Sequence, residues 1–166
     1  MKQIIKAMAM GVLAMMAVTS CTEEKKGYTI NGEISDVKEG VVYLKKYVEK
    51  SFVDVDSAVI TDGKFKFEGV VSEALAHGLT TQKESRRPLV FFLDNDAMNV
   101  TLDESDKQLV VTGSPVNDIY MANAPIVRSK GYNLDSLLSV HPTSPATAYF
   151  IVKDFAYKLN LEEMKS

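Results

Sequence analysis

Apolar residues recur at every second position through the larger part of the chain, from residue 28 to about residue 113. Tyr28, Ile30 and Ile34 show the pattern at its start, with mostly polar residues between them. A period of two is typical of a β-strand, because successive side chains of a strand point to opposite faces. Glycine, aspartate and asparagine interrupt the pattern at short intervals, as expected for turns. The chain is therefore predicted to be mainly β.

Eight segments follow this alternation. They are predicted at residues 28–34, 41–44, 53–59, 64–68, 74–81, 89–93, 98–102 and 108–112. The second is expected to end at Lys45-Lys46, and in the third Val53, Val55 and Val59 are expected to share one apolar face. Asp62-Gly63 lies between the third and fourth segments, and Asp-Gly favours a hairpin turn that requires positive φ at both central residues. Short strands with regular turns predict an antiparallel β-sandwich-like domain over residues 28–114.

The period changes after this domain, and residues 115–166 are predicted to form a short helical appendage. Ser114 as N-cap and Pro115 at the first helical position predict a helix over residues 115–122. A second helix is expected at 133–140. A third is expected at 145–161, where Ser144 and Pro145 repeat the start signal and apolar residues recur at helical spacing. Its predicted apolar face consists of Ala148, Ile151, Val152, Phe155 and Leu159.

Residues 1–20 have the features of a lipoprotein signal peptide. Lys2 and Lys6 precede an uncharged apolar run at 7–18, which is shorter than the about 20 residues that a membrane-spanning helix needs. The sequence Val18-Thr19-Ser20-Cys21 then resembles the lipobox at which such signals are cleaved. Cys21 is therefore the predicted lipidation site, and residues 21–27 are a predicted flexible tether. The alternative is an ordinary secretory signal with a cysteine there by chance.

A lipid on Cys21 would place the protein in the cell envelope. Several acyl chains anchor a protein stably where one chain does not, so the membrane is the first expected partner. The outer membrane is the expected location. Glu23 and Glu24 resemble a surface-export signal, and a plain solvated tether is the alternative, so both the periplasmic and the surface face stay open.

Composition excludes several functions. The formal net charge is −3 and no basic stripe is present, so nucleic acid is not an expected partner. Cys21 is the only cysteine, and a thiol–disulfide exchange site needs two. No serine-hydrolase elbow and no glycine-rich phosphate loop occurs. The sequence therefore predicts no catalytic residue in this chain and no cofactor.

The remaining candidates for chemistry are weak. His77, expected at a strand edge, and His141, expected in a loop before Pro142, have neither the partners nor the spacing of a zinc site. Turn formation explains the acidic clusters at 94–96 and 103–106 better than calcium does. No metal site is therefore predicted. Asp56-Ser57-Ala58 and Asp135-Ser136-Leu137 match a short O-glycan acceptor pattern, for which a strand and a helix turn are the simpler explanations.

Several segments together resemble a known family. They are Tyr28-x-Ile30-x-Gly32-x-Ile34, Gly40-Val-Val-Tyr-Leu44, Asp56-Ser57-Ala58-Val59-x-x-Asp62-Gly63-Lys64-Phe65-x-Phe67-x-Gly69 and Val111-x-Gly113-Ser114-Pro115-Val116-Asn117. This pattern is similar to the N-terminal domain (domain of unknown function 4369) of envelope lipoproteins of the TlpA/ResA-like thiol–disulfide oxidoreductase group. The resemblance covers roughly residues 28–117. In that group a helical linker leads to a thioredoxin-like domain with a Cys-x-x-Cys pair, which this sequence lacks.

The resemblance implies a place in the envelope but no activity. We expect a non-catalytic accessory module that binds a partner, such as another envelope protein, with the helix at 145–161 as a candidate docking face. One alternative is a truncated or split thiol–disulfide oxidoreductase. Another is a glycan- or peptide-binding module, although the chain has no tryptophan and no aromatic cluster that suggests a sugar platform.

Overall fold

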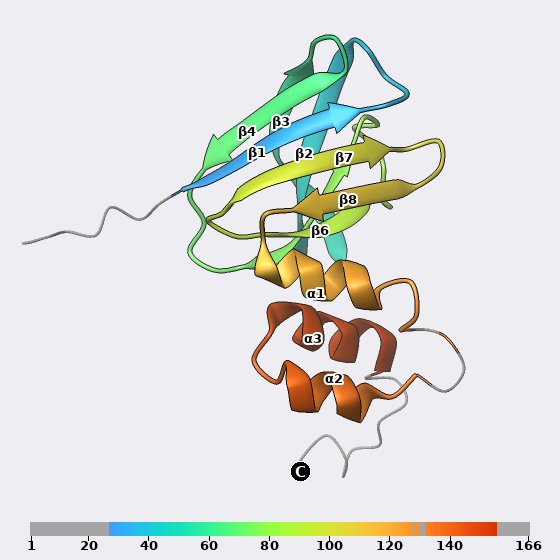
Figure 1. The fold of residues 1–166 in the computed structure, drawn as a ribbon. Helices are drawn as coiled ribbons and strands as arrows, with labels where there is room; N and C mark the ends of the chain where they lie inside the picture. Colours follow the sequence, from blue (N-terminus) through green and yellow to red (C-terminus); the bar gives the residue numbers. More distant parts are fainter. Residues whose placement is uncertain (1–26, 128, 130–131, 156–166) are drawn as a thin grey trace, which may run out of the picture.

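The computed structural model describes residues 27–127, 129 and 132–155, and within them it contains eight strands followed by helices (Figure 1). The strands are β1 (Tyr28–Ile34), β2 (Gly40–Val48), β3 (Ser51–Ile60), β4 (Lys64–Gly69), β5 (Leu75–Thr80), β6 (Leu89–Leu93), β7 (Ala97–Asp103) and β8 (Gln108–Thr112). The helices are α1 (Pro115–Asn123), α2 (Leu134–Val140), α3 (Pro145–Phe150) and the π-helical turn η1 (Ile151–Phe155). Cys21, the predicted signal peptide and Leu159 lie outside the described residues.

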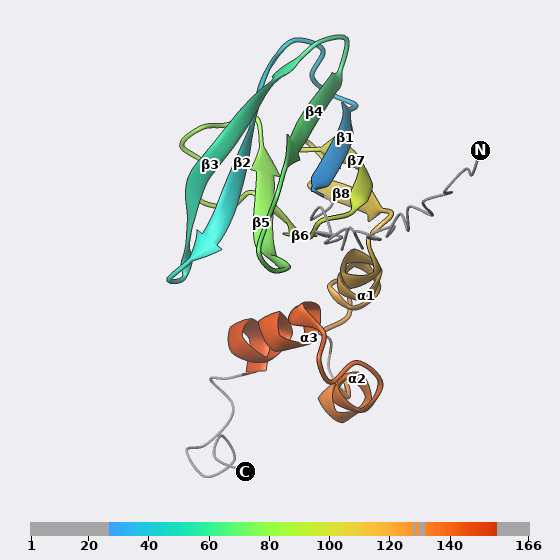
Figure 2. The ribbon, with the colours of Figure 1, turned by 90° about the vertical axis from the view of Figure 1, so that its left-hand side faces the viewer.

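The strands form two four-stranded sheets that lie face to face (Figure 2). The first sheet has the order β4-β1-β7-β8 and the second β3-β2-β5-β6. The prediction of a mainly β, sandwich-like fold is confirmed. Antiparallel pairing has one exception, because β1 and β7 run parallel, with Thr29 opposite Ala97. The chain crosses between the sheets several times before β7 reaches β1, and local alternation carries no signal for such a distant pairing.

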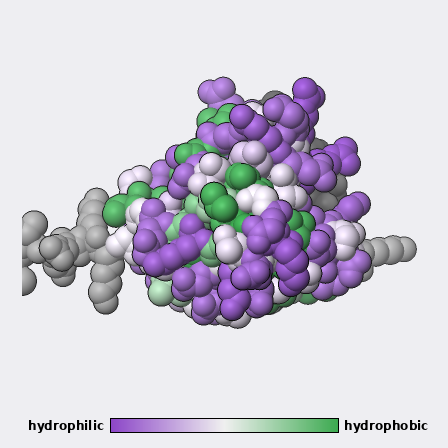
Figure 3. Space-filling model, turned by 90° about the horizontal axis from the view of Figure 1, so that it is seen from above, coloured by the Kyte–Doolittle hydropathy of each residue, from purple (hydrophilic) through white to green (hydrophobic). Residues whose placement is uncertain are grey.

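The space between the sheets is the main hydrophobic core, and it contains the apolar faces that alternation predicts. Ile30 and Ile34 of β1 are at most 1% exposed, and Phe65 and Phe67 of β4 at most 5%. The predicted hairpin at Asp62-Gly63 is confirmed, since φ is 50° at Asp62 and 77° at Gly63. Seen from the end opposite the helices, the surface is dominated by hydrophilic residues, and hydrophobic ones occur in small groups (Figure 3).

Two predictions for the β2–β3 hairpin are wrong. The expected apolar face of β3 is in solvent, with Val59 70% exposed and Val53 44% exposed. The reason is that β3 is an end strand with only β2 beside it, and the extra residue Val55 breaks the alternation, so the three valines do not share one face. β2 also continues past the two lysines to Val48. The Lys45 ammonium is accommodated there because it lies 2.5 Å from the Asp54 carboxylate and donates to the Lys83 carbonyl at 2.6 Å.

The helix starts lie where the sequence predicts them. Ser144 accepts a hydrogen bond from the Ala146 amide, and Asn133 accepts one from the Ser136 amide, so both cap their helices. Ser114 is the N-cap residue of α1, but its hydroxyl makes no capping bond. It accepts instead from the Asn117 side chain at 3.1 Å, which replaces the predicted cap.

The predicted apolar face of the last helix is only partly correct, because Phe155 is half-buried against a second hydrophobic core whereas other members of the face are exposed. The buried residues of α3 and η1 are Ala146, Thr147, Phe150 and Asp154. Ala148 is exposed, and Val152 is 70% exposed. The helix turns this other face to the protein because Phe150 packs into a second hydrophobic core between the helices and the outer face of the second sheet.

Asn117 attaches α1 to the sandwich. It is fully buried, its side-chain oxygen accepts from the Phe92 amide at 2.8 Å, and its side-chain amide donates to the Phe92 carbonyl at 2.7 Å. β6 is the end strand of the second sheet, so this side chain satisfies backbone groups that no neighbouring strand reaches. The second core therefore begins at a polar contact with the sheet edge.

Candidate functional site

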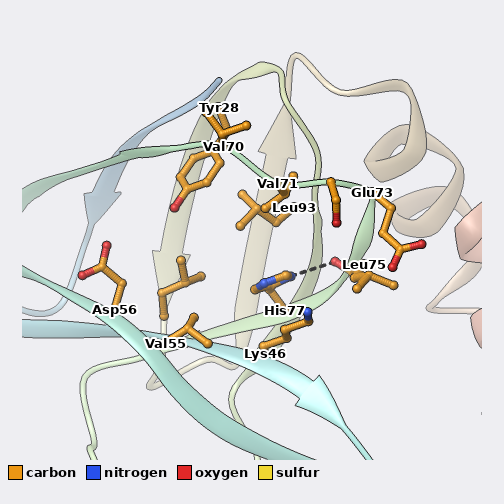
Figure 4. Close-up of a pocket in the computed structure, with 12 residues that line it drawn as sticks. Tyr28, Lys46, Val55, Asp56, Val70, Val71, Glu73, Leu75, His77 and Leu93 are labelled. Atoms are coloured by element: carbon orange, nitrogen blue, oxygen red, sulfur yellow. Dashed lines mark hydrogen bonds between the residues drawn. The ribbon is translucent and has the colours of Figure 1, made fainter. Parts of the chain in front are cut away.

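The two sheets separate as they leave the β3–β4 turn, and a cleft of about 320 Å³ opens between them. Its lining comes from both sheets and from the loop after β4. The lining residues are Tyr28, Leu44, Lys46, Val55, Asp56, Val70, Val71, Ser72, Glu73, Leu75, His77 and Leu93. Figure 4 shows Tyr28 and Val70 on the side of the first sheet and Asp56, Lys46 and His77 on the side of the second. The cleft is the candidate functional site because apolar walls and converging polar groups are combined in it.

A β-bulge shapes the wall that β3 contributes. Leu44 pairs with Asp56, whereas the next residue of β2, Lys45, pairs with Asp54, so Val55 is an extra residue without a partner. A bulge bends its strand and redirects side chains, and here the consecutive residues Val55 and Asp56 both line the cleft. The ion pair between Lys45 and Asp54 therefore holds the bulged part of β3 against β2.

The opposite wall is held by a side-chain contact between two loops. Asn95, in the loop from β6 to β7, accepts from the Val71 amide at 2.9 Å and donates to the Val71 carbonyl at 2.6 Å. Val71 belongs to the loop from β4 to β5, which includes the cleft residues Val70 and Glu73. Two crossing connections between the sheets are thus joined to each other, which keeps this wall in place before any ligand arrives.

Tyr28 can lie against the start of the loop because Gly69 has no side chain. A Cβ at Gly69 would lie 2.7 Å from the Tyr28 hydroxyl oxygen, closer than such atoms can approach. Burial, with a smaller contribution from the negative charge of Asp56, raises the pKa of the Tyr28 phenol above its usual value. The phenol therefore stays protonated at neutral pH, and Asp56 makes this end of the cleft electronegative.

His77 lies on the inner face of β5. Its prediction as a strand-edge residue is wrong, since β5 is an inner strand of its sheet and the side chain is only 3% exposed. Nδ1 lies 2.9 Å from the Leu75 carbonyl oxygen, so Nδ1 is the donor. Burial, helped by the nearby positive charge of Lys46 and opposed by that bond, lowers the pKa of His77. The ring is therefore neutral at pH 7, with Nε2 as a hydrogen-bond acceptor.

The Nε2 atom of His77 has no hydrogen bond with any described residue. Figure 4 shows the ring in the cleft with this nitrogen directed away from Leu75. Among the described residues, the buried side-chain polar atom without a partner is Thr147 Oγ1, so Nε2 of His77 is open to solvent through the cleft, where a donor from a ligand can replace water. The cleft therefore offers an accessible hydrogen-bond acceptor beside its apolar walls.

The other candidates from the sequence lie elsewhere. His141 follows α2, more than sixty residues along the chain from His77, and the described residues contain no group of three or more side chains able to hold a metal ion. Asp103 accepts from the Asp106 amide and from the Ser105 and Ser35 hydroxyls, which lowers the pKa of its carboxyl group. This agrees with the turn explanation of the acidic clusters.

The two glycan-acceptor matches fall on regular structure. Ser57 lies in β3, and Ser136 lies in the first turn of α2. In residues 27–127, 129 and 132–155, no helix has the length and apolar character needed to cross a membrane.

One expectation about aromatic residues is corrected by the fold. Tyr47 and Phe52 belong to the same hairpin, and their ring centroids are 5.1 Å apart. Tyr149 is distant from both in the sequence, yet its ring centroid lies 6.0 Å from that of Tyr47. The Lys153 ammonium lies over Tyr149 and Tyr47 at 5.0 and 5.6 Å from the ring centroids. An aromatic cluster therefore exists, on the outer face of the second sheet, and it joins the sheet to α3.

The cleft was not predicted from the sequence. Tyr28, Lys46, Asp56 and Glu73 become one site only through the crossing of the chain between sheets. One local signal was present: His77 shares the core-facing positions of its strand with Leu75 and Leu79. A histidine in such a row is a candidate for a buried, functional side chain.

The model of a family described as "Domain of unknown function (DUF4369)" matches residues 28–120, which is more than half of the chain. The chain belongs to this family. The DUF4369 match covers all eight strands and most of α1, including the contact between Asn117 and Phe92. A search of curated proteins finds no match to the chain.

The last motif of the DUF4369 segment, Gly113-Ser114-Pro115-Val116-Asn117, has a clear structural role. Gly113 adopts φ of 87°, and a Cβ there would lie 2.4 Å from the Ala97 carbonyl oxygen. The chain can therefore leave β8 sharply, and Pro115 then starts α1 so that Asn117 reaches Phe92. Gly-Ser-Pro-x-Asn in this chain is thus a connector between sandwich and helix.

Proposed function

We propose that this DUF4369 protein is an envelope lipoprotein, anchored through Cys21, whose β-sandwich binds a partner without catalysing a reaction. The lipobox-like Val18-Thr19-Ser20-Cys21 supports the anchor. The outer membrane is the proposed location. An accessory role beside thiol–disulfide oxidoreductases follows from the resemblance described above and belongs to the same proposal.

A single observation carries the binding part of the proposal. The cleft combines a solvent-accessible acceptor, Nε2 of His77, with exposed apolar residues at its rim, where Val55 is 50% exposed and Val70 60% exposed. Exposed apolar groups around a polar hollow are a common feature of binding sites. The walls are held by the Asn95–Val71 and Lys45–Asp54 contacts, so they are arranged before binding.

The anchor is tested by labelling cells with a radioactive fatty acid. The wild-type chain is expected to take up the label and to sediment with membranes, whereas Cys21→Ser is expected to do neither. Uptake of the label by Cys21→Ser, or no label in the wild type, would contradict the anchor.

Partner binding is tested with a photo-crosslinking amino acid placed at Val55 in intact cells. Val110 is the matched control position, because it is 54% exposed and lies on the end strand β8, away from the cleft. We expect one discrete adduct from position 55 and none from position 110. Equal adduct patterns from the two positions would contradict a binding role for the cleft.

A further inference from the structure

We propose that the cleft and the free edge of β3 together bind an extended peptide segment of a partner protein, with an arginine or lysine side chain of that segment directed to Asp56. The inference rests on the proposed partner-binding function and names the chemistry of the partner. It is carried by three features: the edge, the rim and floor of the cleft, and the charges.

The edge of β3 offers backbone hydrogen bonds. β3 is the end strand of the second sheet, so among the described residues only β2 pairs with it along Ser51–Ile60. A free strand edge is a template onto which an extended peptide adds as a further strand. Figure 2 shows β3 diverging from β4, the end strand of the first sheet, beyond the turn that joins them. An added strand can enter at this opening and reach the cleft, because Val55 and Asp56 lie on the edge strand β3 and also line the cleft.

The rim and the floor of the cleft fit one side chain of such a strand. Val55 and Val70 form an apolar rim from opposite sheets, and each is at least half exposed. Below them, His77 presents Nε2 as an acceptor. A peptide donates N–H groups both along its backbone and from basic side chains, so it can replace solvent as the donor to Nε2. A cavity of about 320 Å³ holds one or two side chains and not a folded domain.

The charges favour a basic residue. Asp54 is neutralised by Lys45 on the outer face, whereas Asp56 and Glu73 have no ion-pair partner among the described residues. Asp56 accepts only from the amide of Ser57, at 2.7 Å, which leaves carboxylate lone pairs free. Lys46 lies near His77 at the other end of the cleft, so it leaves the field around Asp56 and Tyr28 negative. A basic side chain of the peptide is therefore stabilised at the Asp56 end of the cleft. At the other end, the Lys46 ammonium can donate to a carbonyl group of the peptide backbone.

The test uses the purified full chain and three synthetic ten-residue peptides of alternating valine and threonine that differ at one central residue. The central residue is arginine, its uncharged analogue citrulline, or glutamate. We expect the arginine peptide to bind roughly tenfold more tightly than the citrulline peptide, as typical for a hydrogen-bonded charge, and the glutamate peptide most weakly. Fluorescence anisotropy measures the three dissociation constants.

Variants assign the effect to the site. Asp56→Asn is expected to remove the difference between arginine and citrulline peptides. His77→Phe, which keeps a ring beside Phe91, is expected to weaken all three peptides several-fold. Val55→Lys is expected to abolish binding, while Val110→Lys on the other end strand leaves it unchanged. Hydrogen exchange with bound peptide is expected to slow at residues 52–57 and to leave α1 and α3 unaffected.

Several results would overturn the inference. They are equal affinities for arginine and citrulline peptides, insensitivity to Asp56→Asn, slowed exchange at the helices instead of β3, and absence of peptide binding. A concentration-dependent dimer that Val55→Lys dissociates would show that a second copy occupies the edge. If peptides fail while the crosslink from position 55 in cells persists, the peptide inference is wrong and the proposed partner binding stands.

Discussion

The protein has two hydrophobic cores, and the two are built in different ways. The core between the sheets is made from residues of all eight strands, such as Ile30, Leu79 and Phe91. The core under the helices collects residues from single positions in distant segments, such as Ala76, Leu137 and Phe150. Phe91 and Phe92 are adjacent in β6, yet they belong to different cores because a strand directs successive side chains to opposite faces.

The two faces of β6 therefore pack against different layers, and the two layers place different requirements on the sequence. The inner core needs only regular alternation, and many sequences satisfy that requirement. The outer core needs the helices at one place, and that place is set by a polar contact: Asn117 binds both backbone groups of Phe92. The helices should therefore depend on a few specific residues, whereas the sandwich should depend on the sum of its apolar faces.

The largest expected effect separates the two cores at one strand. Phe91→Ala and Phe92→Ala should each lower the free energy of unfolding by about 3–5 kcal/mol, because each ring is at most 2% exposed. Phe91→Ala should destabilise the whole sandwich, whereas Phe92→Ala should mainly release the helices. Denaturant unfolding with hydrogen exchange measures both. The same exchange pattern in the two variants would contradict the division into two cores.

The next effect concerns the attachment of α1. Asn117→Ala leaves the amide and the carbonyl of Phe92 buried without partners, which costs about 2–4 kcal/mol. Faster exchange is expected first in α1 and α3, measured by hydrogen exchange. Asn31→Ala, at an exposed position of β1, is the control and should change stability by less than about 0.5 kcal/mol. Uniform loss of protection in both cores would show that the sandwich depends on this contact too.

A pH effect should distinguish the inner face of β5 from the surface. The pKa of His77 is lowered in the folded state, so the unfolded chain binds a proton more readily. Its stabilising contribution is complete above the unfolded pKa of about 6.5 and is lost as pH falls through the lower folded value. Thermal unfolding between pH 7.5 and 5 should show a decline that His77→Phe reduces. His141→Gln, after α2, is the control and should keep the decline.

The smallest effects are expected at valines that sequence patterns assign to a core. Val59→Thr and Val152→Ser should each change the free energy of unfolding by less than about 0.5 kcal/mol, since both side chains are 70% exposed. Thermal or denaturant unfolding of the purified chain checks this. A loss above about 1 kcal/mol at either position would mean that this surface is covered in the native protein.

The success of the sequence predictions follows from how local each signal is. The predicted ranges for β6 and β8 are those of the structure, and Asp62-Gly63 was predicted as a turn. Both succeed because the strand period and the preference for positive φ depend on neighbouring residues. The buried face of β3 was not predictable, because Val59 and Ile60 are similar side chains on opposite faces of the strand. Only the position of the first sheet decides that Ile60 is buried and Val59 is exposed. The cleft was not predictable either, because Tyr28, Asp56 and His77 meet only after two sheets are stacked.

Strands, the turns between them and the starts of the helices could be predicted from the sequence, since propensity, alternation and capping act over a few residues. Contacts between distant segments set the parallel pairing of β1 with β7, the burial of Lys45 and His77, and the exposure of Val59 and Val152. Those outcomes depend on which surfaces meet across the sandwich. Alternation predicts which residues of a strand share a face. Packing between distant segments decides whether that face is buried or exposed to water.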